Sequence, residues 1–99
     1  MRRIGLALVP YLGALAAAAA TKATYKCQDG ARLMATFVDG ASGSGGVELA
    51  FSGGETINVP QAPSADGGRY AGGGVEFWIK GRSATLTRAG RATTCETAR

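Results

Sequence analysis

The sequence predicts an all-β fold, in which a small eight-stranded antiparallel meander closes into a barrel with the help of one disulfide. Apolar and polar residues alternate with a period of two in short segments, a pattern typical of half-buried strands. Clusters of glycine separate these segments and predict turns. Two cysteines, Cys27 and Cys95, lie near the two ends of this region, where a disulfide can join the first strand to the last.

The start of the chain has the order of a secretory signal peptide. Arg2 and Arg3 precede an apolar run at residues 4–15, and small residues follow at 16–20, which gives a charged, an apolar and a small-residue region in turn. A transmembrane helix is the alternative. The apolar run is short for a span of about 20 residues, and Pro10 interrupts it.

We assign residues 1–20 to this signal peptide, with cleavage between residues 20 and 23, and residues 21–99 to a single domain. Export with two cysteines and no CxxC motif predicts a disulfide between Cys27 and Cys95. A domain of this size buries little surface and needs such a link. Because no cysteine directly follows the apolar run, we expect no stable membrane anchor, and we expect the protein to be exported.

The predicted strands follow one another from residue 31. The alternating segments are residues 31–39, 46–54, 55–60, 75–81, 82–90 and 92–97. The glycine-rich segment 67–74 can pair with the segment that follows it as a hairpin. Alternation places one set of apolar side chains on a common inner face: Leu33, Phe37, Val47, Leu49, Phe51, Ile57, Val59, Phe77, Ile79 and Leu86.

Closure of this meander buries its single apolar face and removes exposed sheet edges. We expect side chains to fill the interior, as in other small barrels. An open two-sheet sandwich is the structural alternative.

Composition argues against several functional classes. The chain has 11 Lys and Arg, seven Asp and Glu, no His and a formal net charge of +4, which falls to +2 without Arg2 and Arg3. The charges are interspersed, so nucleic-acid binding has little support. Without His, a nucleophile motif or a phosphate loop, enzymatic activity, metal binding and cofactors are not expected.

The segment that contains Trp78 has an outer face that could bind a partner. Alternation directs Trp78 and Lys80 outward, and Arg69 and Tyr70 lie close by in sequence. Trp78 has two interpretations. It can cover the backbone of the glycine-rich neighbouring strand, or it can serve as a binding anchor, because Trp, Tyr and Arg dominate interface energetics.

Several motifs occur in order along most of the domain. They are Y-x-C-x-x-G at Tyr25, Cys27 and Gly30, L-x-A-x-F from Leu33 to Phe37, SADGGRY from Ser64 to Tyr70, FWIKGRSATL from Phe77 to Leu86, and Cys95. In these motifs the chain resembles the bacterial inhibitors of c-type lysozyme, of the MliC/PliC type. The resemblance implies a periplasmic eight-stranded barrel with a disulfide, which inserts a loop and a lysine into the lysozyme active-site cleft.

The resemblance also implies roles for individual residues. Ser64, Gly67 and Tyr70 match the family's SxSGxxY motif, and Lys80 matches its lysine, whose ammonium can approach the two catalytic carboxylates. Glycine allows the backbone to approach a groove closely, and Tyr70 braces the loop. Asp66 stands where the family has its second serine, and an acid that faces two acids is unfavourable.

We therefore expect the lysozyme-binding residues to be Ser64, Asp66, Gly67, Arg69, Tyr70, Trp78 and Lys80. The predicted partner is a c-type lysozyme, inhibited by occlusion without turnover. The substitution at Asp66 and the net charge of +2, which gives no long-range attraction to a basic lysozyme, support an alternative. In that alternative the chain is a non-inhibitory envelope barrel that binds another cell-wall-associated protein or a glycan.

Overall fold

The computed structural model describes residues 20–38 and 45–97. The predicted signal peptide therefore lies outside the described residues, except for Ala20, at which the first strand begins. In the described part of the chain, no helix is long and apolar enough to cross a membrane.

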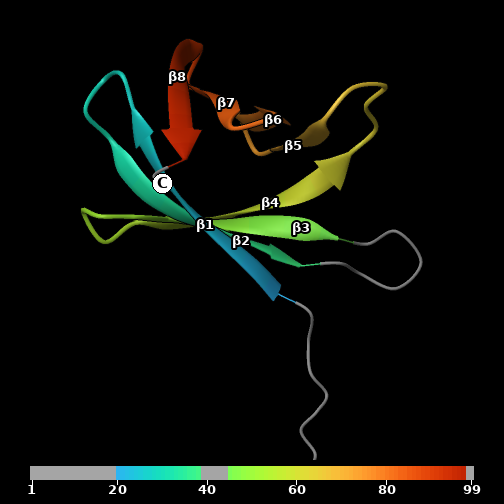
Figure 1. The fold of residues 1–99 in the computed structure, drawn as a ribbon, viewed down its shortest axis with the longest axis horizontal. Coiled ribbons are helices and arrows are strands. Elements are labelled where there is room, and N and C mark those ends of the chain that lie inside the picture. Colours follow the sequence, from blue (N-terminus) through green and yellow to red (C-terminus); the bar gives the residue numbers. More distant parts are fainter. Residues whose placement is uncertain (1–19, 39–44, 98–99) are drawn as a thin grey trace, which may run out of the picture.

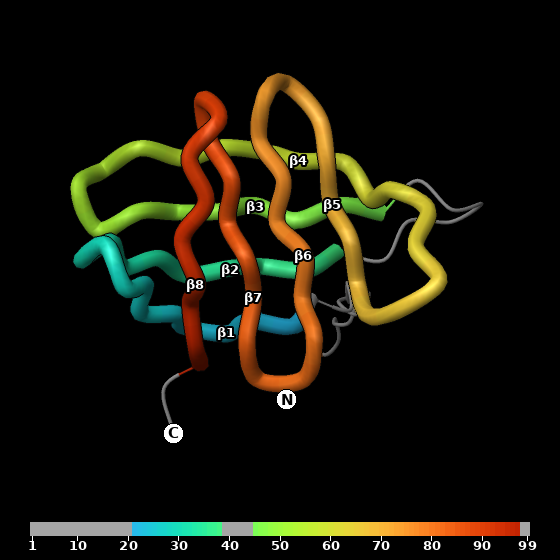
Figure 2. The backbone as a smooth tube through the Cα atoms, turned by 90° about the horizontal axis from the view of Figure 1, so that it is seen from above, coloured from blue at the N-terminus to red at the C-terminus, as the bar shows by residue number. Residues whose placement is uncertain are grey.

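Eight antiparallel strands form a closed barrel in simple sequence order (Figure 1). They are β1 (Ala20–Cys27), β2 (Arg32–Val38), β3 (Gly46–Phe51), β4 (Thr56–Ala62), β5 (Gly68–Gly72), β6 (Val75–Lys80), β7 (Ser83–Arg88) and β8 (Arg91–Thr97). The predicted meander barrel is confirmed, and the open sandwich is wrong. The barrel is flattened: β1–β4 form one layer and β5–β8 the other, and the strands of the two layers cross (Figure 2).

β1 is the strand that sequence alternation did not delimit. Its inward positions are Ala23, Tyr25 and Cys27, and only one of these is a large side chain. Tyr25 nevertheless belongs to the core, with 2% of its surface exposed. Its ring meets that of Phe77 edge to face, with centroids 5.2 Å apart, so this pair ties β1 to the opposite layer.

The predicted inner face forms the core. Leu33, Val47, Leu49, Val59, Phe77 and Leu86 are buried, and Phe37, Phe51, Ile57 and Ile79 are partly buried and packed against them. The core also contains Ala35, Ala84 and both cysteines. Side chains therefore fill the barrel, as expected.

Two short seams join the layers. At the first, β1 and β8 share three paired positions, and one of them places Cys27 directly opposite Cys95. The two cysteines form a disulfide, which confirms the predicted pairing. Cys95 is fully buried, so the bond lies within the core rather than on the surface.

At the second seam, β4 and β5 pair only at Gln61 with Tyr70 and at Ala62 with Arg69. Gln61 donates its amide to Gly45, on the β3 side. Because backbone groups alternate sides along a strand, the next position that faces β5 is Pro60. Proline has no amide hydrogen to donate, so the ladder does not extend back past Gln61. At the other end of these two pairs, after Ala62, the chain enters the connection at residues 63–67.

We predict that the disulfide is necessary for normal stability. Cys27 and Cys95 are 68 residues apart, and cross-linking a loop of that size stabilises by about 4 kcal/mol in the chain-entropy model. Urea unfolding of the oxidised and reduced protein measures this difference. Equal midpoints, or free thiols in the denatured, unreduced protein, would contradict the assignment.

Candidate functional site

The candidate site lies at the barrel end where residues 63–67, the β4–β5 loop, lie beside the last residues of β6. Gly68, at the start of β5, pairs with Ile79 of β6, and Arg69 pairs with Trp78. This register brings the loop next to Lys80, as the predicted hairpin requires. Most of the loop is exposed.

Gly67 allows the loop to touch the backbone of β6. Its φ is +70°, a conformation that side chains with a Cβ rarely adopt. A Cβ at this position would also overlap the carbonyl oxygen of Ile79. Two independent constraints therefore require glycine here, and the close approach is to the chain's own β6.

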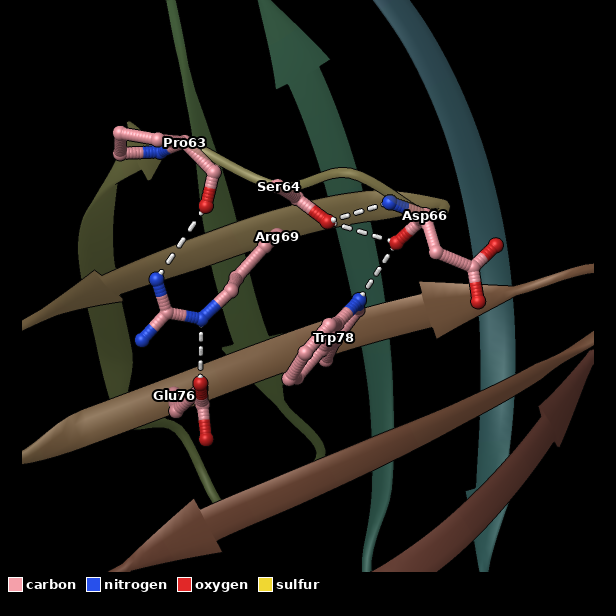
Figure 3. A network of polar contacts seen from close by, with 6 residues as sticks. All are labelled: Pro63, Ser64, Asp66, Arg69, Glu76 and Trp78. Atoms are coloured by element: carbon pink, nitrogen blue, oxygen red, sulfur yellow. Dashed lines mark hydrogen bonds and ion pairs between the residues drawn. The ribbon is translucent and has the colours of Figure 1, made fainter.

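Ser64 and Asp66 form a local turn within the loop. The Ser64 hydroxyl donates to the Asp66 carbonyl oxygen at 2.6 Å and accepts from the Asp66 amide at 3.1 Å. Such serine-to-backbone bonds stabilise turns. The Ser64 hydroxyl is thus occupied in holding the loop, and the Asp66 carboxylate is left to point away from it (Figure 3).

The Asp66 carboxylate faces Lys80. Its Oδ2 atom lies 3.6 Å from the lysine Nζ, and the two side chains are 74% and 58% exposed. An ion pair in this environment contributes little to stability. It does mean that the acid and the base of the predicted site already contact each other in the free protein.

Trp78 is attached to the loop by its indole nitrogen. Nε1 donates to the Asp66 carbonyl oxygen at 2.8 Å (Figure 3). Two cations lie over the indole: Lys80 Nζ is 4.7 Å and Arg69 Cζ is 5.4 Å from the ring centroid. These cation–π contacts contribute about 0.5–1 kcal/mol each at exposed sites. In the free protein the indole thus contacts the loop backbone and its cross-strand partner Arg69 on β5.

Arg69 contacts the other end of the loop. Its Nη1 donates to the Pro63 carbonyl oxygen at 3.3 Å, while its Nε contacts Glu76 Oε2 at 2.6 Å (Figure 3). The Arg69 and Glu76 side chains are 32% and 31% exposed, so water screens this ion pair less than it screens Asp66 and Lys80.

Tyr70 lies on β5, close after the loop in sequence, and packs against the core. Its ring contacts that of Phe37 on β2, with centroids 5.7 Å apart, and an ideal Cβ on Gly68 would lie 3.6 Å from it. Tyr70 is partly buried, and together with the larger effect of burial it raises the pKa of Tyr25. This position suits the bracing role that the resemblance implies.

The structure therefore brings all seven predicted site residues to one end of the barrel. Sequence reasoning missed Glu76 and Pro63. Glu76 shares the outward face of β6 with Trp78, so alternation could have included it. The role of Pro63 depends on its backbone oxygen, which no residue type indicates.

Comparison with known proteins identifies the family. The family model described as "Membrane-bound lysozyme-inhibitor of c-type lysozyme", MliC, matches residues 25–94. The chain belongs to this family. The MliC match begins at Tyr25, where the first motif begins, and ends one residue before Cys95, so it confirms the resemblance over nearly all of the barrel.

A solved structure of an MliC protein is similar throughout. It is described as the crystal structure of Pseudomonas aeruginosa MliC in complex with hen egg white lysozyme. The two proteins are 26% identical with a TM-score of 0.69, and the match covers 95% of this chain and 100% of that chain. No curated protein matches the chain.

We predict that Gly67→Ala destabilises the protein more than Gly73→Ala. The two glycines have similar φ values, +70° and +62°, but a Cβ at Gly73 would meet no atom within 4 Å. The extra loss for Gly67 isolates its contact with Ile79 and should be about 1–3 kcal/mol, the usual range for overpacking. Urea unfolding of both variants measures it. Equal losses would show that only the backbone conformation matters.

Proposed function

We propose that the protein inhibits c-type lysozyme by occupying its active-site cleft with the β4–β5 loop and Lys80. Membership of the lysozyme-inhibitor family and the similarity to an MliC described in complex with lysozyme support this. The observation that carries the proposal is the contact between the loop and Lys80 at one exposed barrel end. An occluding inhibitor needs no turnover chemistry, so no residue is assigned a catalytic role.

Lys80 supplies the attraction in this proposal. Lysozyme cleaves glycosidic bonds with two carboxyl groups that flank the scissile bond. The lysine ammonium is a compact donor that suits such a carboxylate. Its pairing with Asp66 presents a small obstacle, because two exposed charges separate at little cost.

Asp66 opposes this attraction. At an effective dielectric constant of about 20, two unit charges about 4 Å apart interact by about 4 kcal/mol, so its repulsion is similar in size to the attraction from Lys80. Protonation relieves the repulsion. The general acid of lysozyme holds its proton up to a raised pKa of about 6, and its O–H can then donate to the Asp66 carboxylate.

The cellular setting in the proposal is the periplasm. The signal-peptide composition of residues 1–20 and the disulfide both suit an exported protein. The second candidate is an envelope barrel that binds another cell-wall-associated protein, and the charge at Asp66 is the observation that favours it. A glycan is less well supported, because a sugar that stacks on Trp78 must displace Lys80 or Arg69 from its ring.

We predict opposite effects for two substitutions in the site. Asp66→Ser removes the repulsion and should lower the inhibition constant. Lys80→Ala should raise the inhibition constant, with a loss of about 2–5 kcal/mol of binding free energy when the ion pair with lysozyme is desolvated. Cell-wall lysis by hen egg white lysozyme in the presence of each purified protein gives the constants.

Arg82→Ala is the matched control for Lys80→Ala. Arg82 is exposed in the turn that follows β6, so its loss removes one positive charge from the same barrel end. It should change the inhibition constant little. No change in Lys80→Ala, or full lysozyme activity at high micromolar wild-type protein, would contradict the proposal and favour the second candidate.

Asp66 should also make inhibition depend on pH. The hydrogen bond to Asp66 favours the protonated general acid, so the pKa of that acid is higher in the complex than in free lysozyme. The extra affinity is therefore fully present below the free-enzyme pKa of about 6 and lost as the pH rises through the pKa in the complex. For the wild type, the inhibition constants measured below and above these pKa values should differ. For Asp66→Ser, the difference should be smaller. An equal dependence in both proteins would exclude this role.

A further inference from the structure

Two side chains of the barrel wall hold the β4–β5 loop by its backbone. Trp78 Nε1 donates to the Asp66 carbonyl oxygen at 2.8 Å, and Arg69 Nη1 donates to the Pro63 carbonyl oxygen at 3.3 Å. The two acceptors lie at the beginning of the loop and near its end. Neither contact depends on the side chain of the loop residue that accepts it (Figure 3).

The two donors are themselves fixed. Arg69 and Trp78 are opposite each other on β5 and β6, and the Arg69 guanidinium lies over the indole ring. Glu76 holds the same guanidinium through Nε at 2.6 Å. Because the planar guanidinium has several donors in a rigid fork, one contact with Glu76 orients the other donor toward Pro63.

This arrangement substitutes for the strand pairing that the loop's own seam lacks. The β4–β5 ladder has only two paired positions, and Pro60 ends it. Few backbone bonds therefore join the two strands that flank the loop to each other. The side chains on β5 and β6 and the backbone contact at Gly67 supply the missing restraint.

We propose that Arg69, Glu76 and Trp78 are positioning residues that preform the loop, and that Arg69 and Trp78 act through it rather than by contacting lysozyme. The effect of this positioning on affinity for lysozyme rests on the proposed function. A loop that is ordered before binding loses less conformational entropy in the complex, so preorganisation increases affinity without adding a contact. In a variant with a disordered loop, only a fraction of the molecules has the loop in its binding-competent form. The apparent dissociation constant is then the intrinsic one divided by that fraction.

The test compares backbone order in the free protein with inhibition of hen egg white lysozyme. In the wild type, amide ¹⁵N relaxation should give residues 64–67 order parameters of about 0.85, the value typical of a rigid backbone. In Trp78→Phe and in Arg69→Gln, the values for the loop should fall below about 0.6, while those of β6 and β7 stay unchanged. Each inhibition constant should rise about tenfold, the effect of losing roughly one hydrogen bond.

Two further variants refine the comparison. Arg82→Gln removes one positive charge at the same barrel end, as Arg69→Gln does, and should change neither loop order nor inhibition. Arg69→Lys keeps the charge but loses the fork, so its single ammonium cannot replace both contacts, and its values should fall between those of the wild type and Arg69→Gln. Because Arg69 is partly exposed, these variants test the proposal even where Trp78→Phe fails to fold.

The outcomes separate the two proposals. Unchanged loop order in both Arg69→Gln and Trp78→Phe overturns the positioning role, and a raised inhibition constant in that case means that these side chains contact lysozyme directly. A wild-type loop with order parameters already below about 0.6 also overturns it. If the variants show increased loop disorder but the wild-type protein inhibits no lysozyme, the positioning role is supported and the proposed function is refuted.

Discussion

The bond between Cys27 and Cys95 closes a seam at which β1 and β8 share three paired positions. Until this seam forms, the meander of eight strands has two unpaired edge strands, and its apolar inner face stays exposed to water. The edge-to-face contact of Tyr25 with Phe77 depends on it, because β1 must be in place for the two layers to meet. The burial of Phe77, Ala84 and Leu86 on β6 and β7 likewise requires a closed barrel.

The two seams are strengthened in different ways, and the difference sets where the candidate site lies. The β1–β8 seam has a covalent bond inside the core. The β4–β5 seam has two paired positions, and its neighbouring loop is held from outside the barrel by Trp78 and Arg69. The exposed loop therefore sits at the less restrained seam, on a wall whose outer face carries the groups that hold it.

Sequence reasoning succeeded where residue type alone carries the information. Alternation identified the inner face, because a period of two is a direct consequence of strand geometry. It did not delimit β1, where small residues occupy most inward positions. The motifs named residues that the structure brings together at one end of the barrel, but residue types could not show that Trp78 and Arg69 donate to backbone oxygens. Nor could they show that Asp66 contacts Lys80 in the free protein, because both contacts depend on the path of the loop.

Pro60 has a consequence for the behaviour of the protein in concentrated solution. Before Gln61, β4 is no longer hydrogen-bonded to β5, and an unpaired strand is a template for self-association and aggregation. Proline removes the amide hydrogen at the first position of this exposed edge, and Gly72 approaches the proline ring so closely that a Cβ there would lie 2.9 Å from Pro60 Cδ. A strand from a second molecule meets neither a donor nor free space at this point. The residue that shortens the seam thus also protects the edge that the seam leaves open.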